Sequence, residues 1–166
     1  ARNTPVAVLM NPRSAECVKV FFGVWAAGCF YAPLDSMLPP ERLKLIMQNL
    51  QPTAIVYDEE SRAKAEAVCP DGCECVLWSD AAQSPVDADK LVQIRQTVTP
   101  DHLAAILYTS GSTGIPKGVA HTQGSLMAYT EETIERYQFT ENTVFGNQSP
   151  FFYANSIIDI FPPALL

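Results

Sequence analysis

The sequence has little positive charge and no long apolar run. Its 166 residues include 11 Lys and Arg against 18 Asp and Glu, which gives a formal net charge of −7. Nucleic-acid-binding domains need a basic patch, so this balance argues against a nucleic acid partner. The longest apolar stretch, Val20–Leu34, is too short to span a bilayer, and the chain does not begin with a signal-peptide pattern. We therefore expect neither a nucleic acid nor a membrane partner.

The sequence also lacks a cysteine and histidine pattern typical of metal sites. Three of the five cysteines, Cys69, Cys73 and Cys75, lie close together but do not form paired CxxC units. The only histidines, His102 and His121, are not at zinc-finger spacing. The odd number of cysteines argues against a simple disulfide framework. We expect no metal site here and reduced thiols, as in a cytoplasmic protein.

What the sequence has is the composition of a packed domain, with 48% hydrophobic and 17% charged residues. Short apolar runs of strand length alternate with helical patterns. The expected strands are Val6–Met10, Phe30–Leu34, Thr53–Tyr57, Glu74–Trp78, Leu103–Tyr108 and Val144–Gln148. This alternation predicts an α/β fold with a mostly parallel sheet and flanking helices.

The expected helices carry recognisable start signals. Ser14 can cap the first, which Gly28 ends, and proline with an acidic residue opens the second at Pro39–Pro40. The remaining helices are expected over Glu59–Val68, near Lys90–Ile94, from Thr122 or Ser125 onward, and over Ser156–Ile160. For the helix that starts at Thr122 or Ser125, the expected buried side is Leu126, Tyr129, Ile134 and Tyr137.

Hydroxyl residues, glycines and one lysine gather directly after the strand Leu103–Tyr108, in the run Tyr108–Val119, YTSGSTGIPKGV. Glycine lets main-chain N–H groups approach an anion closely, hydroxyls donate hydrogen bonds, and Lys117 adds a positive charge. The run is not a Walker A loop, because Gly118 follows Lys117 where Ser or Thr would be needed. A generic run of this kind is a hydrophilic surface loop. The order of residues here instead favours a cradle for a polyphosphate.

Residues Thr109–Val119 resemble the phosphate-loop motif of the adenylate-forming superfamily. This superfamily includes acyl-CoA synthetases, luciferases, adenylation domains of non-ribosomal peptide synthetases and D-alanine–carrier-protein ligases. The segments Trp25–Asp35 and Leu38–Leu43 resemble the AGxxYxPLD and PxERL patterns of its amino-acid-activating branch. The resemblance covers nearly the whole chain. It implies that residues 1–166 are part of the large N-terminal adenylation core, without the small C-terminal subdomain.

The resemblance implies a two-step reaction. A carboxylic acid attacks the α-phosphate of ATP, pyrophosphate leaves, and the acyl-adenylate is transferred to a thiol of a phosphopantetheinyl carrier protein or of coenzyme A. Lys117 is the expected catalytic residue. The expected ATP contacts are Thr109, Ser110, Gly111, Ser112, Thr113, Gly114 and Lys117. The family's Mg²⁺-binding and ribose-binding segments, Tyr-Gly-x-Thr-Glu and Thr-Gly-Asp, do not occur in the chain, so we expect the metal ligand outside it and the chain alone to be inactive.

One segment departs from the family pattern. Residues Ser149–Phe161 resemble PFSFDxSVxEIF, and Ala154 stands where amino-acid-activating members carry the aspartate that pairs with the α-ammonium group. A buried ammonium group without a counter-ion is costly. Either the substrate lacks an α-amino group, or another residue accepts it. Asn155 and Asp159 are close in sequence, although a helix through Ser156 is expected to point Asp159 elsewhere.

The candidate substrate-pocket residues are Tyr153 and Ala154. Individually, Phe151, Phe152 and Tyr153 are typical core residues, but as a group beside Ala154 they suit a pocket for an apolar or aromatic acid. We interpret His121 as a structural or surface residue.

Two functions of different classes fit these patterns. The first is an acid–thiol ligase, which acts on an amino acid or on an aryl or other carboxylic acid. The second is a degenerate adenylation domain that binds ATP without catalysis and serves as a scaffold, which Ala154 would favour.

Overall fold

The computed structural model describes residues 3–109 and 116–166. Its six-stranded sheet has the order β4-β3-β1-β2-β5-β6. The strands are β1 (Pro5–Leu9), β2 (Phe30–Pro33), β3 (Ala54–Tyr57), β4 (Glu74–Leu77), β5 (Leu103–Thr109) and β6 (Lys117–Thr122). Neighbouring strands from β4 to β5 pair in parallel, and β6 alone runs antiparallel to β5. The predicted α/β class with a mostly parallel sheet is confirmed.

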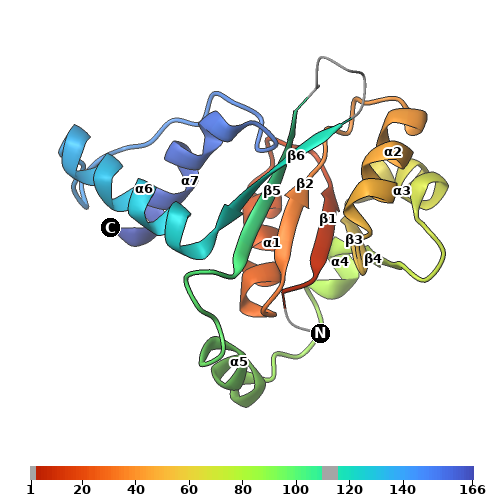
Figure 1. Cartoon of the computed structure of the whole chain (residues 1–166), viewed down its shortest axis with the longest axis horizontal. Helices are drawn as coiled ribbons and strands as arrows, with labels where there is room; N and C mark the ends of the chain where they lie inside the picture. The colour runs from red at the N-terminus through yellow and green to blue at the C-terminus, as the bar shows by residue number, and fades with distance from the viewer. Residues whose placement is uncertain (1–2, 110–115) are drawn as a thin grey trace.

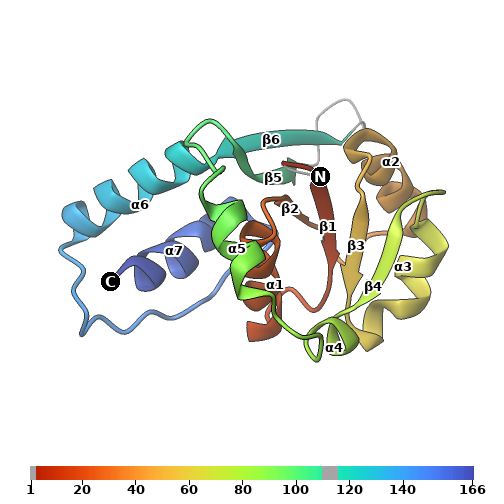
Figure 2. The same ribbon diagram turned by 90° about the horizontal axis from the view of Figure 1, so that it is seen from below.

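The helices cover both faces of the sheet (Figures 1 and 2). They are α1 (Ala15–Ala26), α2 (Pro40–Leu50), α3 (Arg62–Val68), α4 (Trp78–Ala81), α5 (Ala88–Arg95), α6 (Gln123–Tyr137) and α7 (Ile157–Leu165). Successive β1 residues face opposite sides. Val6 and Val8 join a core with α1, α6 and α7, whereas Ala7 and Leu9 join a core with α2 and α3. Burial of β1 on both faces explains why its sequence is a continuous apolar run.

Two helix starts follow the hydroxyl capping signals in the sequence. The Ser14 hydroxyl accepts a hydrogen bond from the Glu16 N–H at 3.2 Å, at the start of α1. Gly28 follows the end of α1 with φ +73°, where a Cβ would also meet Ile94 at 2.8 Å. Thr122 and Ser125 were alternative starts for α6, and the structure uses both, because Thr122 is the N-cap and the two residues form a capping box.

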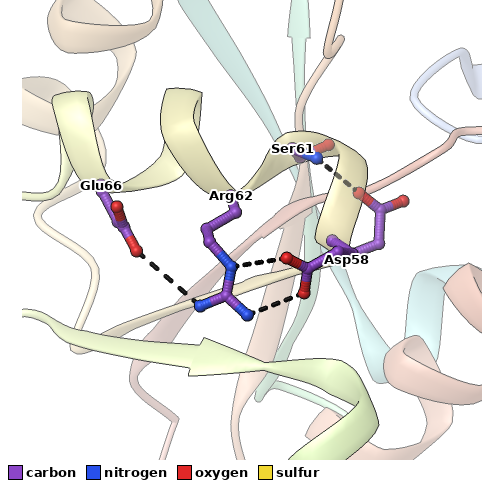
Figure 3. Close-up of polar contacts among 5 residues, drawn as sticks. Asp58, Ser61, Arg62 and Glu66 are labelled. Atoms are coloured by element: carbon purple, nitrogen blue, oxygen red, sulfur yellow. Dashed lines mark hydrogen bonds and ion pairs between the residues drawn. The ribbon is translucent and has the colours of Figure 1, made fainter.

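Polar side chains gather just after the carboxyl end of β3, where Asp58 bonds to Ser61 and Arg62 forms ion pairs (Figure 3). One carboxylate oxygen of Asp58 accepts a hydrogen bond from the Ser61 N–H at 3.0 Å, and the other accepts from the Asn11 N–H at 2.6 Å, just after β1. Arg62 adds a bidentate contact to Glu59 at the surface. Exposed ion pairs contribute little to stability, so Asp58 is the contact that joins the two strand ends.

A bulge in β5 is satisfied by a side chain from α1. The register of β5 against β6 shifts between Leu103 and Ala105, which leaves the carbonyl of the buried Ala104 free to bond elsewhere. The indole N–H of Trp25 donates to that carbonyl at 2.7 Å. The Trp25 ring also stacks on Phe161 of α7, at 5.1 Å between ring centroids. One tryptophan thus joins α1, β5 and α7.

Three expectations about secondary structure were wrong. The segment Val144–Gln148 is not a strand: Val144 is 94% exposed, and Phe145 packs on Phe139 instead of on the sheet. Trp78 begins the short helix α4 instead of ending β4. The strand β6 was missed because Lys117–Val119 were assigned to the phosphate loop and Thr122 to the start of a helix.

The buried side of α6 also differs from the expected one. The helix buries Leu126, Thr130 and Thr133, whereas Tyr129 and Tyr137 are exposed. The Thr130 hydroxyl donates to the Leu126 carbonyl at 2.7 Å, so the threonine can be buried without leaving its hydroxyl unpaired.

The five cysteines are free thiols, and the closest pair is Cys75 and Cys69, with 2.7 Å between their sulfur atoms in a hydrogen bond. In the part of the chain that the structure describes, no helix is both long and apolar enough to cross a membrane.

The Trp25 contact can be tested by substitution. We expect Trp25→Phe to lower the free energy of unfolding of the intact protein by about 1–3 kcal/mol, because the buried Ala104 carbonyl loses its partner. Chemical denaturation measures this. The matched control is Trp78→Phe. In the wild type the Trp78 indole N–H donates at 2.8 Å to the solvent-accessible carboxylate of Glu16, so this substitution should lower the free energy of unfolding by less. Equal costs for the two variants would contradict a special role for the Ala104 carbonyl.

Candidate functional site

The β5–β6 hairpin brings together the two ends of the predicted phosphate loop. Thr109 and Lys117 are Cα partners across the two strands, and the Thr109 hydroxyl donates to the Lys117 carbonyl at 3.4 Å. Both residues are exposed. They lie at the carboxyl edge of the parallel strands (Figure 1), where ligands bind in open α/β sheets. The expected contacts Ser110, Gly111, Ser112, Thr113 and Gly114 lie outside the described residues.

Gly118 makes this strand pairing close. A Cβ atom at this position would lie 2.6 Å from a methyl group of Ile106 and 3.4 Å from the ring of Tyr108. The Tyr108 hydroxyl in turn donates to the Asn49 side-chain carbonyl of α2 at 2.8 Å. Glycine after Lys117 therefore permits the close pairing of β6 with β5.

A cavity of about 750 Å³, here called the loop cavity, opens beside the ends of this hairpin. Its wall includes Thr109 and Pro116 from the hairpin, Asp35 and Arg42 from the start of the α2 region, and Tyr153. The Arg42 guanidinium brings positive charge to the cavity, while the Asp35 carboxylate accepts a hydrogen bond from the Met37 N–H at 2.9 Å.

A second cavity of about 730 Å³, here called the helix cavity, lies between α6 and the segment that leads into α7. Its wall includes Tyr129, Gln148, Ile158 and Asp159. The two cavities share four wall residues, which are His121, Ser149, Ala154 and Asn155. They therefore adjoin, and Ala154 stands at their common boundary.

The structure separates the aromatic residues that the sequence placed together. Phe151 is 7% exposed and packs edge-to-face on Phe21 in the core, at 6.4 Å between ring centroids. Phe152 and Tyr153 line the loop cavity, and Tyr153 is 56% exposed. The candidate pocket residues Tyr153 and Ala154 thus both face a cavity, whereas Phe151 is a core residue.

One residue that lines both cavities, His121, was not assigned to the site from the sequence. It was interpreted as a structural or surface residue, yet it lies on the wall of each cavity. Burial lowers the pKa of its imidazole below the usual 6.5, so the ring is neutral at neutral pH. Side chains alternate along a strand, so Lys117, Val119 and His121 share one face of β6, and the last two line the loop cavity.

The expectation that Asp159 points away from Ala154 was wrong. Asp159 lines the helix cavity together with Ala154, and its carboxylate accepts a hydrogen bond from the Asn147 side-chain amide at 2.9 Å. The segment Ala154–Ser156 is a 3₁₀ turn, and the α-helix begins only at Ile157. A 3₁₀ turn has fewer residues per turn than an α-helix, so it changes which side of α7 faces the cavity.

The described residues contain no group of three or more His, Cys, Asp or Glu side chains placed to hold a metal ion. The expected Mg²⁺ ligand outside this chain stays a prediction.

Residues 1–166 match the family model described as AMP-binding enzyme. The chain belongs to this family. L-proline–[L-prolyl-carrier protein] ligase of Pseudomonas fluorescens is 32% identical over 163 residues, which cover 93% of this chain and 32% of that protein. D-alanine–D-alanyl carrier protein ligase of Bacillus cereus is 30% identical over 153 residues, which cover 89% of this chain and 28% of that protein. The chain therefore spans about a third of the length of these curated relatives.

Solved structures share the fold. ATP-bound MatB from Rhodopseudomonas palustris superposes with a TM-score of 0.83 at 23% identity, over 98% of this chain and 34% of that one. A four-domain nonribosomal peptide synthetase bound to AMP and glycine superposes with a TM-score of 0.77 at 26% identity, over 98% of this chain and 11% of that one. The resemblance to the adenylate-forming superfamily is confirmed. The assignment of residues 1–166 to part of a larger core is still a prediction.

The neutral state of His121 gives a pH-dependence prediction. Because the folded-state pKa lies below the unfolded-state value, the unfolded chain binds the proton more readily, and stability falls as pH drops below about 6.5. We expect His121→Gln to reduce the loss of unfolding free energy between about pH 7 and about pH 5. Denaturation series at several pH values measure this. His102→Gln, at a position that lines neither cavity, should leave the wild-type pH dependence in place. A pH dependence unchanged by His121→Gln would contradict the prediction.

Proposed function

We propose that the intact protein activates a carboxylic acid with ATP and transfers the acyl group to a thiol. One oxygen of the carboxylate attacks the α-phosphorus of ATP. The bond from that phosphorus to the pyrophosphate oxygen breaks, and its electron pair leaves with pyrophosphate. The acyl-adenylate is then attacked by a thiol, and AMP is released. The pairing of Lys117 with Thr109, which lines the loop cavity, is the observation that carries this proposal.

The loop cavity suits the nucleotide and its phosphates. Its volume of about 750 Å³ lies within the range of about 300–1,000 Å³ for small-molecule sites. Thr109 and Lys117 mark the two ends of the loop that we propose to bind the β- and γ-phosphates. Lys117 and Arg42 supply positive charge where negative charge grows on the departing pyrophosphate. When bound, Mg²⁺ would neutralise further phosphate charge.

The helix cavity suits the acid. It adjoins the loop cavity at His121, Ser149, Ala154 and Asn155, so a carboxylate held at this boundary would meet the α-phosphate of a nucleotide in the loop cavity. Positioning of this kind accounts for much of the rate enhancement in two-substrate reactions. We propose that Tyr153 and Ala154 contribute to this boundary. A neutral His121 would not form a competing ion pair with the carboxylate.

We propose the phosphopantetheine of a carrier protein as the thiol acceptor. The relatives that support this choice are named as ligases that load proline or D-alanine onto carrier proteins. Coenzyme A is the other acceptor that the chemistry permits, and thioester formation with each thiol separates the two.

A second candidate function is ATP binding without catalysis. Ala154, in place of the ammonium-binding aspartate, favours it. Such a protein would bind ATP in calorimetry yet show no acid-dependent pyrophosphate exchange.

Lys117 provides the direct test. We expect Lys117→Ala in the intact protein to lower the rate of acid-dependent ATP–pyrophosphate exchange by roughly 100-fold or more, because the leaving pyrophosphate loses a positive charge. The control is Lys44→Ala, an exposed lysine of α2 that pairs with Glu41 at 3.6 Å and lines neither cavity. Exchange at the wild-type rate in Lys117→Ala would refute the role of Lys117. If the wild-type protein binds ATP but no acid from a broad panel supports exchange, the non-catalytic alternative is favoured.

A further inference from the structure

Three cysteines gather where α3 ends and the edge strand β4 begins. Cys69 is the C-cap residue of α3, Cys73 immediately precedes β4, and Cys75 is its second residue. The Cys73 N–H donates to the Pro70 carbonyl at 3.1 Å, and Gly72 has φ +80°, the conformation that a type II turn needs at this position. This tight turn reverses the chain and brings Cys75 back to the end of α3.

The sulfur atoms of Cys69 and Cys75 are already in contact. The Cys75 thiol donates to the Cys69 sulfur at 2.7 Å, while the Cys69 thiol donates to the Cys73 carbonyl at 3.4 Å. The bond in a disulfide is about 2.0 Å long, so a small movement of the side chains would join this pair. The Cys73 thiol instead donates to the Glu74 carbonyl at 3.9 Å. Cys75 is therefore the favoured partner of Cys69.

The pair is accessible to small solutes and lies at the edge of the sheet. Cys75 is exposed and Cys69 is half-buried. In the described sheet, β4 pairs with β3 alone, and α3 packs beside it (Figure 2). Because an edge strand is paired on one side only, a covalent link to α3 would restrain a strand that the sheet holds less firmly than its central strands.

A metal site is the other use that clustered thiols suggest, and the geometry disfavours it. Among the described residues, the three thiols do not form a group placed to hold a metal ion. Metal binding also requires thiolates, whereas partial burial raises the pKa of Cys69 and of Cys75, and the Glu66 carboxylate adds to this effect at Cys75. The thiols are therefore protonated at neutral pH, which keeps the pair reduced until an oxidant accumulates.

We propose that Cys69 and Cys75 form a reversible disulfide when the protein meets an oxidant of the peroxide class. The small thiolate fraction of Cys69, which accepts the hydrogen bond from Cys75, attacks one oxygen of hydrogen peroxide. The O–O bond breaks, and the departing hydroxide takes up a proton to become water. The Cys75 sulfur then attacks the sulfenic acid on Cys69, the S–O bond breaks, and a second water leaves. Two thiols and one peroxide thus give one disulfide and two waters.

The charges around the pair favour a neutral oxidant. The Glu66 and Glu74 carboxylates act on these thiols, so they would repel an anionic oxidant such as glutathione disulfide more than hydrogen peroxide. The inference is independent of the proposed function. Cys75 lies near the start of β4, at the amino edge of the parallel strands, whereas Thr109 ends β5 at the opposite edge.

Peptide mapping of the intact protein tests the inference. The protein is treated with hydrogen peroxide, denatured, alkylated with N-ethylmaleimide and digested. Cleavage before Asp71 and after Glu74 places the three cysteines on three separate fragments. We expect the Cys69 and Cys75 fragments to be linked by a disulfide in most of the protein, and the Cys73 fragment to be alkylated. Dithiothreitol added before alkylation should abolish the link and leave all three fragments alkylated.

Substitutions sharpen the test. Cys75→Ser should abolish the linked pair, whereas the matched control Cys73→Ser, at a neighbouring thiol of the same cluster, should form it at the wild-type yield. Thermal unfolding establishes that each variant is folded. If Cys75→Ser does not fold, the mapping of the wild-type protein still decides the question.

Several results would overturn the inference. They are oxidation of Cys75 to a sulfinic acid without a link, a link between Cys69 and Cys73, and loss of the link in Cys73→Ser. Stoichiometric binding of Zn²⁺ that Cys75→Ser abolishes would also overturn it, because the cluster would then be a metal site.

Discussion

β6 runs back along β5 in a sheet whose other neighbouring strands are parallel, and this reversal holds the site together. A parallel strand would need a long crossover, whereas an antiparallel strand returns after a short loop and keeps both loop ends adjacent. Thr109 and Lys117 are therefore paired. Two local features permit the pairing: Gly118 allows close approach to Ile106, and the β5 bulge is satisfied by Trp25.

The same reversal positions the second cavity. β6 ends at Thr122, which caps α6, so the hairpin and the helix share one fixed junction. α6 then packs beside α7 (Figures 1 and 2), and the helix cavity lies between α6 and the segment that enters α7. His121, next to the cap, is thereby held at the boundary of both cavities. Changes to the β5–β6 pairing would consequently alter the acid side of the site as well as the phosphate side.

Local sequence signals predicted much of this arrangement. Strands buried on both faces, the Ser14 cap and the Gly28 end of α1 depend on neighbouring residues, and the structure contains all of them. The phosphate loop was found from the order of its residues, although its central part is still a prediction.

The errors arose where a distant partner decides the outcome. β6 contains glycine, histidine and threonine in an unremarkable order, and only its pairing with β5 makes it a strand, because strand preference depends on context. Val144 and Phe145 resemble strand residues, but they pair with no strand of the described sheet. The orientation of Asp159 depends on a 3₁₀ turn that helical periodicity does not reveal. Cavity residues such as His121 come from separate elements, so no local pattern identifies them.

Positive and negative charges are distributed unevenly around the two cavities, although the chain as a whole has a net charge of −7. Lys117 at the hairpin and Arg42 on the wall of the loop cavity provide positive charge where we propose that phosphates bind. Asp35 lies on that wall too, but its carboxylate is hydrogen-bonded to the backbone N–H of Met37. At the far side, Asp159 provides negative charge. The acidic chain thus has positive charge beside the proposed phosphate site, and the uncharged residues Ser149, Ala154 and Asn155 line the boundary between that site and the wall that carries Asp159.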